Sequence, residues 1–216
     1  MTDIFEVIRS QRACRNFSDQ PVDDETVGRL LDAATHAPSA ENRQPWVFLV
    51  VRDAATRARL HDLSEHAWEQ GGRAYSTGRL STRLLADVEH GIAGGGYRAA
   101  PIVVVVAADT TRAHPATIPA SIFPAVQNLL LAAHATGLGS ALTTLTTGFA
   151  SELTDLLGLP DHVVAQAVVP LGYPSKALGP PRREPFAEHT YRDRFGTDHG
   201  DTIVRVGGGT YDFQVR

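Results

Sequence analysis

The 216-residue chain is long enough for one substantial domain, and its composition, 43% hydrophobic and 20% charged, is ordinary for a globular protein. Its formal net charge of −4 argues against a nucleic-acid binder, because such domains usually carry a strong basic excess. The single cysteine, Cys14, excludes an intramolecular disulfide and a cysteine-rich zinc site. The N-terminus has no signal-peptide pattern, and no apolar stretch approaches the ~20 residues that span a bilayer. We therefore expect a cytoplasmic protein that binds neither membrane nor nucleic acid.

Two helices are predicted before the first strand. Thr2 or Asp3 can cap the first helix, and Asp23 can cap the second, which ends near Pro38. Their apolar residues recur at helical spacing. These stripes are Ile4, Phe5, Val7 and Ile8 in the first helix, and Val27, Leu30, Leu31 and Ala34 in the second.

A strand and a long helical region follow. Trp46–Val51 is continuously apolar and rich in β-formers, as a strand buried on both faces should be. Asp53 can cap a helical region that reaches about His90 and bends at the glycines 71, 72 and 78. Gly94–Gly96 is expected to act as a flexible joint.

The second half of the chain contains the clearest central strand, Pro101–Val106. Ser121 is expected to open a helix in which Pro124 falls in the first turn, where proline is tolerated. Gly137 and Gly139 should stop that helix. The remaining elements are expected to be a strand at Ser140–Leu145, a helix at Ser151–Leu157 and a strand at Val163–Leu171.

The alternation of strands and helices places the chain in the α/β or α+β class. The tail after Gly172 is rich in proline, arginine and glycine, and is predicted to be an extended arm. Its large apolar residues should be buried on something, and docking on a partner subunit is the natural hypothesis. They are Phe186, Tyr191, Phe195, Tyr211 and Phe213.

Two arginine-bearing segments are candidates for binding a small anion. Gln11–Phe17 presents Arg12 and Arg15 in a non-helical stretch with free backbone N–H groups, and guanidinium groups suit a phosphate. Two solvated loop arginines would give the same pattern. Pro180–Pro185 carries a further arginine pair that could reach the same anion, or could form a semi-rigid linker.

Two other segments carry polar groups between regular elements. Ala37–Trp46 sets Ser39, Asn42 and Gln44 between two prolines, and polar loops on a rigid scaffold often bind ligands. An ordinary helix-to-strand connection remains the alternative. Gly137–Leu145 offers threonines and backbone groups to a cofactor edge, or is simply a helix stop and a strand.

Several other interpretations fail. The glycine run Gly91–Gly96 follows a helix and precedes a strand, which reverses the order that a dinucleotide-binding fingerprint needs. The nine histidines show no metal spacing, since His61 and His66 do not share a helix face. We find no nucleophile with an acid–base partner, and Cys14 is interpreted as a small apolar filler rather than a thiol of lowered pKa.

Taken in chain order, these segments resemble the FMN-dependent nitroreductase family of flavin oxidoreductases. The resemblance spans most of the chain. It rests on several motifs that occur in the same order as in the family, not on any one of them. Its motifs are Arg12-x-x-Arg15-x-Phe17, Ala37-Pro-Ser-x-x-Asn42-x-Gln-Pro-Trp46, Ala100-Pro101, Gln127–Ala133, Gly137-Leu-Gly139, Gly172-Tyr-Pro and Arg182-Arg183.

The resemblance implies an α+β fold, a three-layer α-β-α sandwich with a mixed, mainly antiparallel central sheet. Residues 1–172 would form a single FMN-binding domain. Residues 173–216 would form its extended C-terminal arm, exchanged between the subunits of a homodimer. Two FMN sites would lie at the subunit interface.

The resemblance also implies roles for individual residues. Arg12 and Arg183 would hold the FMN phosphate, and Arg15 would reach the pyrimidine end of the flavin, where its charge would stabilise the reduced form. Gln11 and Ala13 replace the arginine and serine common in the family, so phosphate binding would depend more on Arg12 and the arm. The full set of implied cofactor-binding residues is Arg12, Ala13, Arg15, Pro38, Ser39, Asn42, Gln44, Thr143, Thr144, Leu145, Arg182 and Arg183.

Within this set, the loop at Pro38–Ser39 would come from the other subunit. Thr143 and Thr144 stand where many members have bulkier or acidic residues, so contacts to the ring near N5 would be made mainly by the backbone at Thr144–Leu145.

The implied activity is transfer of hydride from NADH or NADPH to flavin N5 and on to a nitroaromatic, quinone or similar acceptor, by a ping-pong mechanism. No catalytic side chain and no metal are required, because the cofactor carries the chemistry. Three alternatives stay open. They are another flavin reaction such as flavin cleavage, dehalogenation or dehydrogenation, an FMN-binding or sensing protein without turnover, and a dimer without a cofactor.

Overall fold

The computed structural model describes residues 3–196 of the chain. The chain divides into two compact units, Met1–Pro180 and Pro181–Arg216, which are considered separately. The first unit contains all the long helices and strands that the structure describes.

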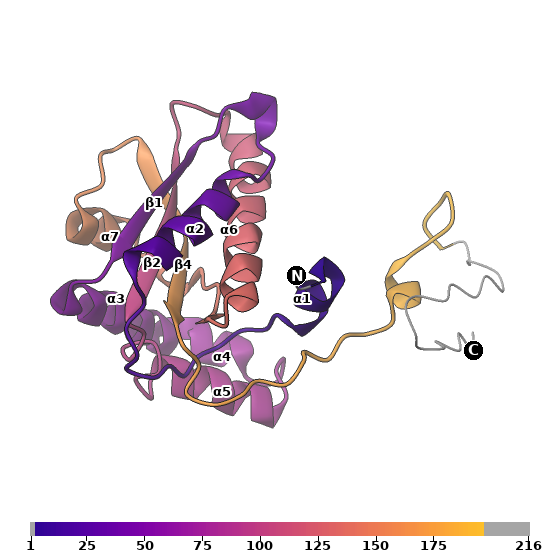
Figure 1. Cartoon of the computed structure of the whole chain (residues 1–216), viewed down its shortest axis with the longest axis horizontal. Helices are drawn as coiled ribbons and strands as arrows, with labels where there is room; N and C mark the ends of the chain where they lie inside the picture. Colours follow the sequence, from indigo (N-terminus) through magenta and orange to yellow (C-terminus); the bar gives the residue numbers. More distant parts are fainter. Residues whose placement is uncertain (1–2, 197–216) are drawn as a thin grey trace. The chain divides into compact units, whose positions relative to one another are not determined.

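A four-stranded antiparallel sheet forms the centre of the first unit, in the order β1-β2-β4-β3 (Figure 1). A parallel bridge between Ala13 and Ser140 adds the segment after the first helix to the β3 edge. The sheet is therefore mixed and mainly antiparallel, as the family resemblance implied. Its strands are β1 (Trp46–Val51), β2 (Ile102–Asp109), β3 (Gly139–Ser140) and β4 (Val163–Gly172).

Strand β2 explains how the layers form, because its successive side chains point to opposite faces. Val104 and Val106 pack with the cluster that contains α2 (Asp24–Thr35) and α6 (Ile118–Ala135). Val103 and Val105 belong to a second cluster, together with Leu60 of α3 (Ala54–Ala67) and Leu153 of α7 (Ala150–Leu157). The result is the predicted three-layer α-β-α sandwich (Figure 1).

Strand β1 differs from its prediction. It was expected to be buried on both faces, yet five of its six residues are only half-buried. The reason is its position: within residues 3–196 it pairs with β2 alone and lies at the edge of the sheet.

The predicted interrupted helix is confirmed. Asp53 caps α3 by accepting a hydrogen bond from the Thr56 backbone N–H, at 2.7 Å. The helix passes into a π-turn at Trp68–Gly72, which is followed by α4 (Arg73–Ser76) and α5 (Thr82–Ile92). Gly78 has a φ of +79° in the turn before α5, a conformation that favours glycine.

Helix α6 begins three residues earlier than Ser121, at Ile118, so the predicted helix start is wrong and Pro124 lies inside the helix. The Ser121 hydroxyl does not cap the helix. It donates to the Thr117 carbonyl at 3.1 Å and accepts from the Ala40 N–H at 3.1 Å, tying the loop before β1 to the helix.

The stretch Pro115–Ala135 has 21 residues and is long and apolar enough, by length and composition alone, to cross a membrane. The expectation that no such stretch exists is therefore wrong. In the fold this stretch supplies the core helix, with eight residues of α6 buried. Helix α6 packs mainly against α2 and the sheet.

Helix α1 (Ile4–Ser10) begins as predicted, with the Asp3 carboxylate accepting from the Phe5 N–H at 3.0 Å. Its apolar stripe is mostly uncovered, because only Val7 is buried. Ile4, Phe5 and Ile8 are 56%, 65% and 51% exposed.

The predicted strand Ser140–Leu145 is wrong beyond its first residue. Strand β3 ends at Ser140, Thr143 forms one isolated bridge to Val168, and a 3-10 turn starts at Leu145. The Thr143 hydroxyl accepts from the Leu145 N–H at 3.2 Å. This side-chain bond satisfies the backbone within a turn and competes with extended pairing.

The described part of the second unit contains a 3-10 turn at Phe186–His189 and little other regular structure. Phe186, Tyr191 and Phe195 are exposed, and the Tyr191 and Phe195 rings lie 4.4 Å apart. Tyr211 and Phe213 lie outside the described residues. Docking of the arm 173–216 on a partner subunit stays a prediction.

Candidate functional site

The segment after α1 is fixed at the β3 edge of the sheet. The Cys14 N–H donates to the Ser140 carbonyl at 2.9 Å, and Phe17 forms an isolated bridge with Pro174. A Cβ at Gly139 would lie 2.6 Å from both Cβ and Sγ of Cys14. Glycine at position 139 therefore allows the close approach that places Arg12 and Arg15.

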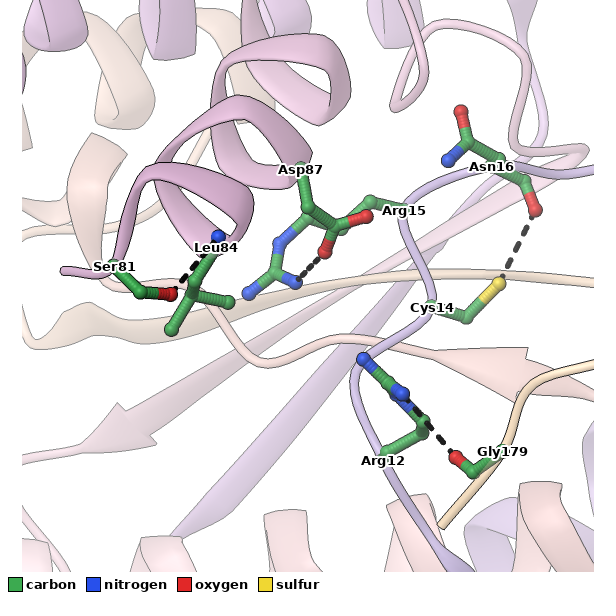
Figure 2. A network of polar contacts seen from close by, with 8 residues as sticks. All are labelled: Arg12, Cys14, Arg15, Asn16, Ser81, Leu84, Asp87 and Gly179. Atoms are coloured by element: carbon green, nitrogen blue, oxygen red, sulfur yellow. Dashed lines mark hydrogen bonds and ion pairs between the residues drawn. The ribbon is translucent and has the colours of Figure 1, made fainter. Parts of the chain in front are cut away.

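Cys14 is the apolar filler that its sequence context indicated. It is 1% exposed and belongs to a cluster with Phe17, Tyr97 and Ala141. Burial raises the pKa of its thiol, which donates to the Asn16 carbonyl at 3.2 Å (Figure 2). A buried thiol of raised pKa is inert toward most nucleophilic chemistry.

The glycine run that failed as a dinucleotide fingerprint has a structural role. A Cβ at Gly96 would lie 2.1 Å from the Arg15 carbonyl oxygen, and a Cβ at Gly91 would lie 2.7 Å from Arg15 Cβ. The end of α5 and the turn after it thus receive the backbone and stem of Arg15. The spacing of these glycines gave no indication of that contact.

The Arg15 guanidinium is paired. Its Nη1 lies 2.8 Å from Oδ2 of Asp87 on α5, and the two side chains are 16% and 35% exposed (Figure 2). Tyr97 lies beside it: burial raises the pKa of this tyrosine, and the neighbouring Arg15 opposes the rise. Asp87 could not be identified from the sequence, because a single acidic residue on an amphipathic helix gives no indication of its partner.

Arg12 has a different partner. Its Nη1 donates to the Gly179 carbonyl at 3.2 Å, whereas Arg15 contacts Asp87 of α5 (Figure 2). The Nε atoms of both arginines are buried without a hydrogen-bond partner among residues 3–196. Unsatisfied cationic donors are costly to bury, and the positive charge of these two side chains fits an anionic ligand.

The residues expected at the ring of the flavin lie next to this segment. Ala13 and Leu145 both pack against the cluster around Cys14 and Tyr97. Thr143 is fixed by two 2.9 Å backbone hydrogen bonds with Val168. The single chain therefore brings together four of the expected residues, namely Ala13, Arg15, Thr143 and Leu145.

The loop from Ala37 to Trp46 is exposed at residues 41–44, and its backbone is strained there. Glu41, Asn42 and Gln44 have φ values of 54°, 53° and 51°, which non-glycine residues rarely adopt. Its polar groups bond to one another: the Gln44 N–H donates to Ser39 Oγ at 3.0 Å, and Gln44 Nε2 donates to Asn42 Oδ1 at 3.2 Å. Strain of this kind clusters at ligand-binding segments.

This loop and the Arg12–Arg15 segment lie at opposite ends of the sheet (Figure 1). The loop leads into Trp46, which pairs with Ala108 near the end of β2, whereas β3 pairs with the end of β4 that lies beside Ile102. At about 3.3 Å per residue, strand β2 separates the two ends by about 23 Å. One copy of the chain therefore does not bring both candidate segments together.

Arg182 and Arg183 belong to the second unit and are exposed. The Arg183 Nη1 donates to the Arg182 carbonyl at 2.9 Å. Their approach to Arg12 stays a prediction.

Comparison with known proteins agrees with this architecture. The sequence model of the nitroreductase family matches residues 8–173. An NADH dehydrogenase of Thermus thermophilus is 34% identical over 185 residues, which cover 82% of this chain and 89% of that protein. Human iodotyrosine deiodinase 1 is 27% identical over 199 residues, 85% of this chain and 66% of that protein.

A solved structure from Desulfovibrio desulfuricans, described as a nitroreductase in complex with FMN, superposes with a TM-score of 0.67. It is 28% identical in sequence, and the match covers 90% of this chain and 99% of that one. The family match covers well over half of the chain, and it includes the Arg12–Arg15 segment, the Ala37–Trp46 loop and the whole sheet. This chain belongs to the nitroreductase family.

Proposed function

We propose that the protein is an FMN-dependent oxidoreductase that accepts hydride from NADH or NADPH and passes it to a nitroaromatic, a quinone or a similar small acceptor. The observation that carries the proposal is the pair of buried Nε donors on Arg12 and Arg15 that have no hydrogen-bond partner in the described part of the chain. They lie on the segment that the family match contains, and a relative of the same fold is described in complex with FMN.

In this proposal Arg12 binds the FMN phosphate together with Arg182 and Arg183 of an arm. Guanidinium groups suit this task because they stay charged and offer paired donors to phosphate oxygens. The carbonyl of Gly179, which Arg12 now contacts, leaves the other donors of that guanidinium available.

Arg15 is proposed to face the pyrimidine end of the ring. The backbone at Ala13 and at Thr143–Leu145 is proposed to face the edge of the ring. Ala13 and Leu145 already pack against one apolar cluster in the single chain, and that cluster contains Tyr97, the neighbour of Arg15. Bound FMN supplies the hydride chemistry at N5, so the protein needs to bind and orient its ligands and to tune charge. No acid–base side chain is assigned.

Pro38, Ser39, Asn42 and Gln44 are proposed to reach the flavin from a second copy of the chain. Strand β2 is about 23 Å long and separates the two candidate segments within one copy, which supports this proposal. A homodimer with exchanged arms would also cover the exposed stripe of α1 and the half-buried edge strand β1.

Iodotyrosine deiodinase 1 among the relatives favours one second candidate, reductive removal of halogen from an aromatic substrate. The two candidates share the cofactor and the donor half-reaction and differ only in the acceptor. A panel that contains a nitroaromatic, a quinone and a halogenated tyrosine separates them.

The test is anaerobic stopped-flow absorbance of the FMN-loaded protein. Mixing with NADH or NADPH should reduce the bound flavin much faster than free FMN, and mixing the reduced protein with each acceptor should reoxidise it. Independence of the second rate from the donor used supports the ping-pong scheme. Bound flavin that neither donor reduces contradicts an oxidoreductase and favours a binding or sensing role.

A further inference from the structure

We infer that Asp87 of α5 is a positioning residue for the proposed flavin site. Asp87 holds the Arg15 guanidinium and sets how much positive charge Arg15 presents to the pyrimidine end of the ring. The inference rests on the proposed function and deepens it, because it assigns a residue that the site motifs do not contain. Asp87 lies outside the Arg12–Phe17 motif, on a different element.

The geometry shows that one helix holds Arg15 twice. Its guanidinium contacts Asp87 at 2.8 Å, and its backbone and stem lie against Gly91 and Gly96, where no Cβ would fit. Gly91 belongs to the last turn of the same helix, and Gly96 follows in the turn after it. The direction of the Arg15 side chain is therefore fixed from α5, while its buried Nε stays without a partner in the described chain.

The local charge depends on Asp87. Arg12, Arg15 and Asp87 all act on the neighbouring Cys14 thiol, the two arginines lowering its pKa and the aspartate raising it. Asp87 is the one carboxylate ion-paired with Arg15 within residues 3–196. Because the Arg15 side chain is only 16% exposed, solvent screens this pair less than it screens an ordinary surface pair.

The consequence for a bound flavin follows from charge alone. Two-electron reduction makes the pyrimidine end of the flavin more negative, so an uncompensated guanidinium there favours the reduced form. A carboxylate that neutralises part of this charge makes the midpoint potential of the bound flavin more negative than an unpaired guanidinium would. Removal of the Asp87 charge should therefore strengthen binding of reduced FMN relative to oxidised FMN, and removal of Arg15 should do the opposite.

The experiment uses two variants that remove the charge, Asp87→Asn and Asp87→Ser. They are compared with Asp87→Glu, which keeps the charge, and with a matched control on the same helix, Glu89→Gln. Glu89 pairs with Arg73 at 2.7 Å, but the Arg73 side chain is 66% exposed. For each variant the midpoint potential of bound FMN, the dissociation constant of oxidised FMN and the melting temperature of the flavin-free protein are measured.

We expect Asp87→Asn and Asp87→Ser each to favour reduced over oxidised FMN by about tenfold, the order expected for one partly buried charge. Tenfold in this ratio corresponds to a shift of about 30 mV toward positive potential. Asp87→Glu and Glu89→Gln should keep the wild-type potential. A purely structural role for Asp87 would lower the melting temperature and FMN affinity without the positive shift.

An unchanged or lower potential in both charge-removing variants, or an equal shift in Glu89→Gln, overturns the role of Asp87 and leaves the proposed function standing. A wild-type protein that binds no FMN overturns the function itself, and this role with it.

Discussion

Arg12 and Arg15 were identified as candidate binding residues from the sequence, but their partners in the fold were not. The spacing of these residues in a non-helical segment made them candidates for an anion site, and only the family resemblance implied their roles at a flavin. The sequence did not predict that Arg12 would contact the Gly179 carbonyl or that Arg15 would pair with Asp87. Both partners are more than 70 residues away along the chain, and such pairings are set by the fold rather than by local pattern.

At this scale we predict that Arg12→Ala lowers the amount of FMN that copurifies and weakens FMN binding by at least tenfold. The reason is loss of a charge-assisted, paired contact to phosphate, worth roughly 1.5–3 kcal/mol. Isothermal titration of the flavin-free protein with FMN measures the change. Arg29→Ala, at an exposed position of α2, serves as the control and should bind FMN as the wild type does. Equal affinities for all three proteins would remove Arg12 from the phosphate site.

His61 is a second residue whose environment was not predicted: the sequence indicated only that it shares no helix face with His66 and favoured a surface or helix-end position, yet it is buried. Its side chain is 2% exposed, its Nε2 lies 3.6 Å from Glu65, and its Nδ1 is buried without a hydrogen-bond partner in the described chain. Burial lowers the pKa of His61, Glu65 opposes that shift, and Arg98 adds to it.

The direction of that shift gives a pH prediction. Since the folded protein resists protonation of His61, the unfolded chain binds more protons once the pH falls below about 6.5, the pKa of a free histidine. Stability should therefore fall as the pH drops through that value, and the loss should be complete below the folded pKa. Urea unfolding of the flavin-free protein at several pH values between 7.5 and 5 measures it.

The control for this prediction is His36→Gln, at a histidine whose side chain is 74% exposed. His36→Gln should keep the wild-type pH dependence, whereas His61→Gln should show a flatter one. The same slope in both variants would show that other groups govern acid sensitivity.

At the scale of elements, the sequence was most reliable where one physical signal dominated. Strand β2, with its run of valines, and the helices capped by Asp23 and Asp53 formed where predicted. The prediction failed where tertiary contacts override the local signal. Ser121 was interpreted as a helix cap because serine favours caps. In the fold its hydroxyl instead connects α6 to the Ala40 backbone.

The short β3 strand gives the element-scale prediction. Gly139→Ala should destabilise the protein by about 1–3 kcal/mol, because the added methyl group would overlap Cys14 and displace the segment that carries Arg12 and Arg15. Chemical denaturation provides the free energy, and FMN affinity should fall with it. Gly28→Ala is the control: apart from its chain neighbours and the backbone of its own helix, no atom of the described residues lies within 4 Å of its Cβ position in α2. It should stabilise the protein by about 0.5–1 kcal/mol. A neutral Gly139→Ala would contradict the close packing of β3 on Cys14.

At the scale of the whole molecule, one chain does not bring the two candidate segments together. The resemblance implied that the loop at Pro38–Ser39 serves the site of another subunit, and that loop leads into β1 at the far end of the sheet from Arg12. Composition and periodicity alone could not reveal this arrangement, since neither carries information about which end of the sheet a loop reaches.

We therefore predict that Phe5→Glu with Ile8→Glu, on the exposed stripe of α1, converts a dimer into monomers and greatly lowers FMN content. Charges placed in a buried interface remain unpaired, which disfavours association. Size-exclusion chromatography with light scattering reports the mass. Tyr75→Glu is the control, because Tyr75 of α4 is similarly exposed, at 68%, and should leave the dimer intact. A double variant that stays dimeric and keeps its FMN would place the interface elsewhere.

The central claim is that this chain binds FMN and receives hydride through it. The most direct test is the absorption spectrum of the purified protein, recorded without oxygen before and after addition of NADH or NADPH. We predict a bound-flavin spectrum, with close to one FMN per chain after reconstitution, that at least one donor bleaches. A colourless protein that takes up no added FMN would contradict the account.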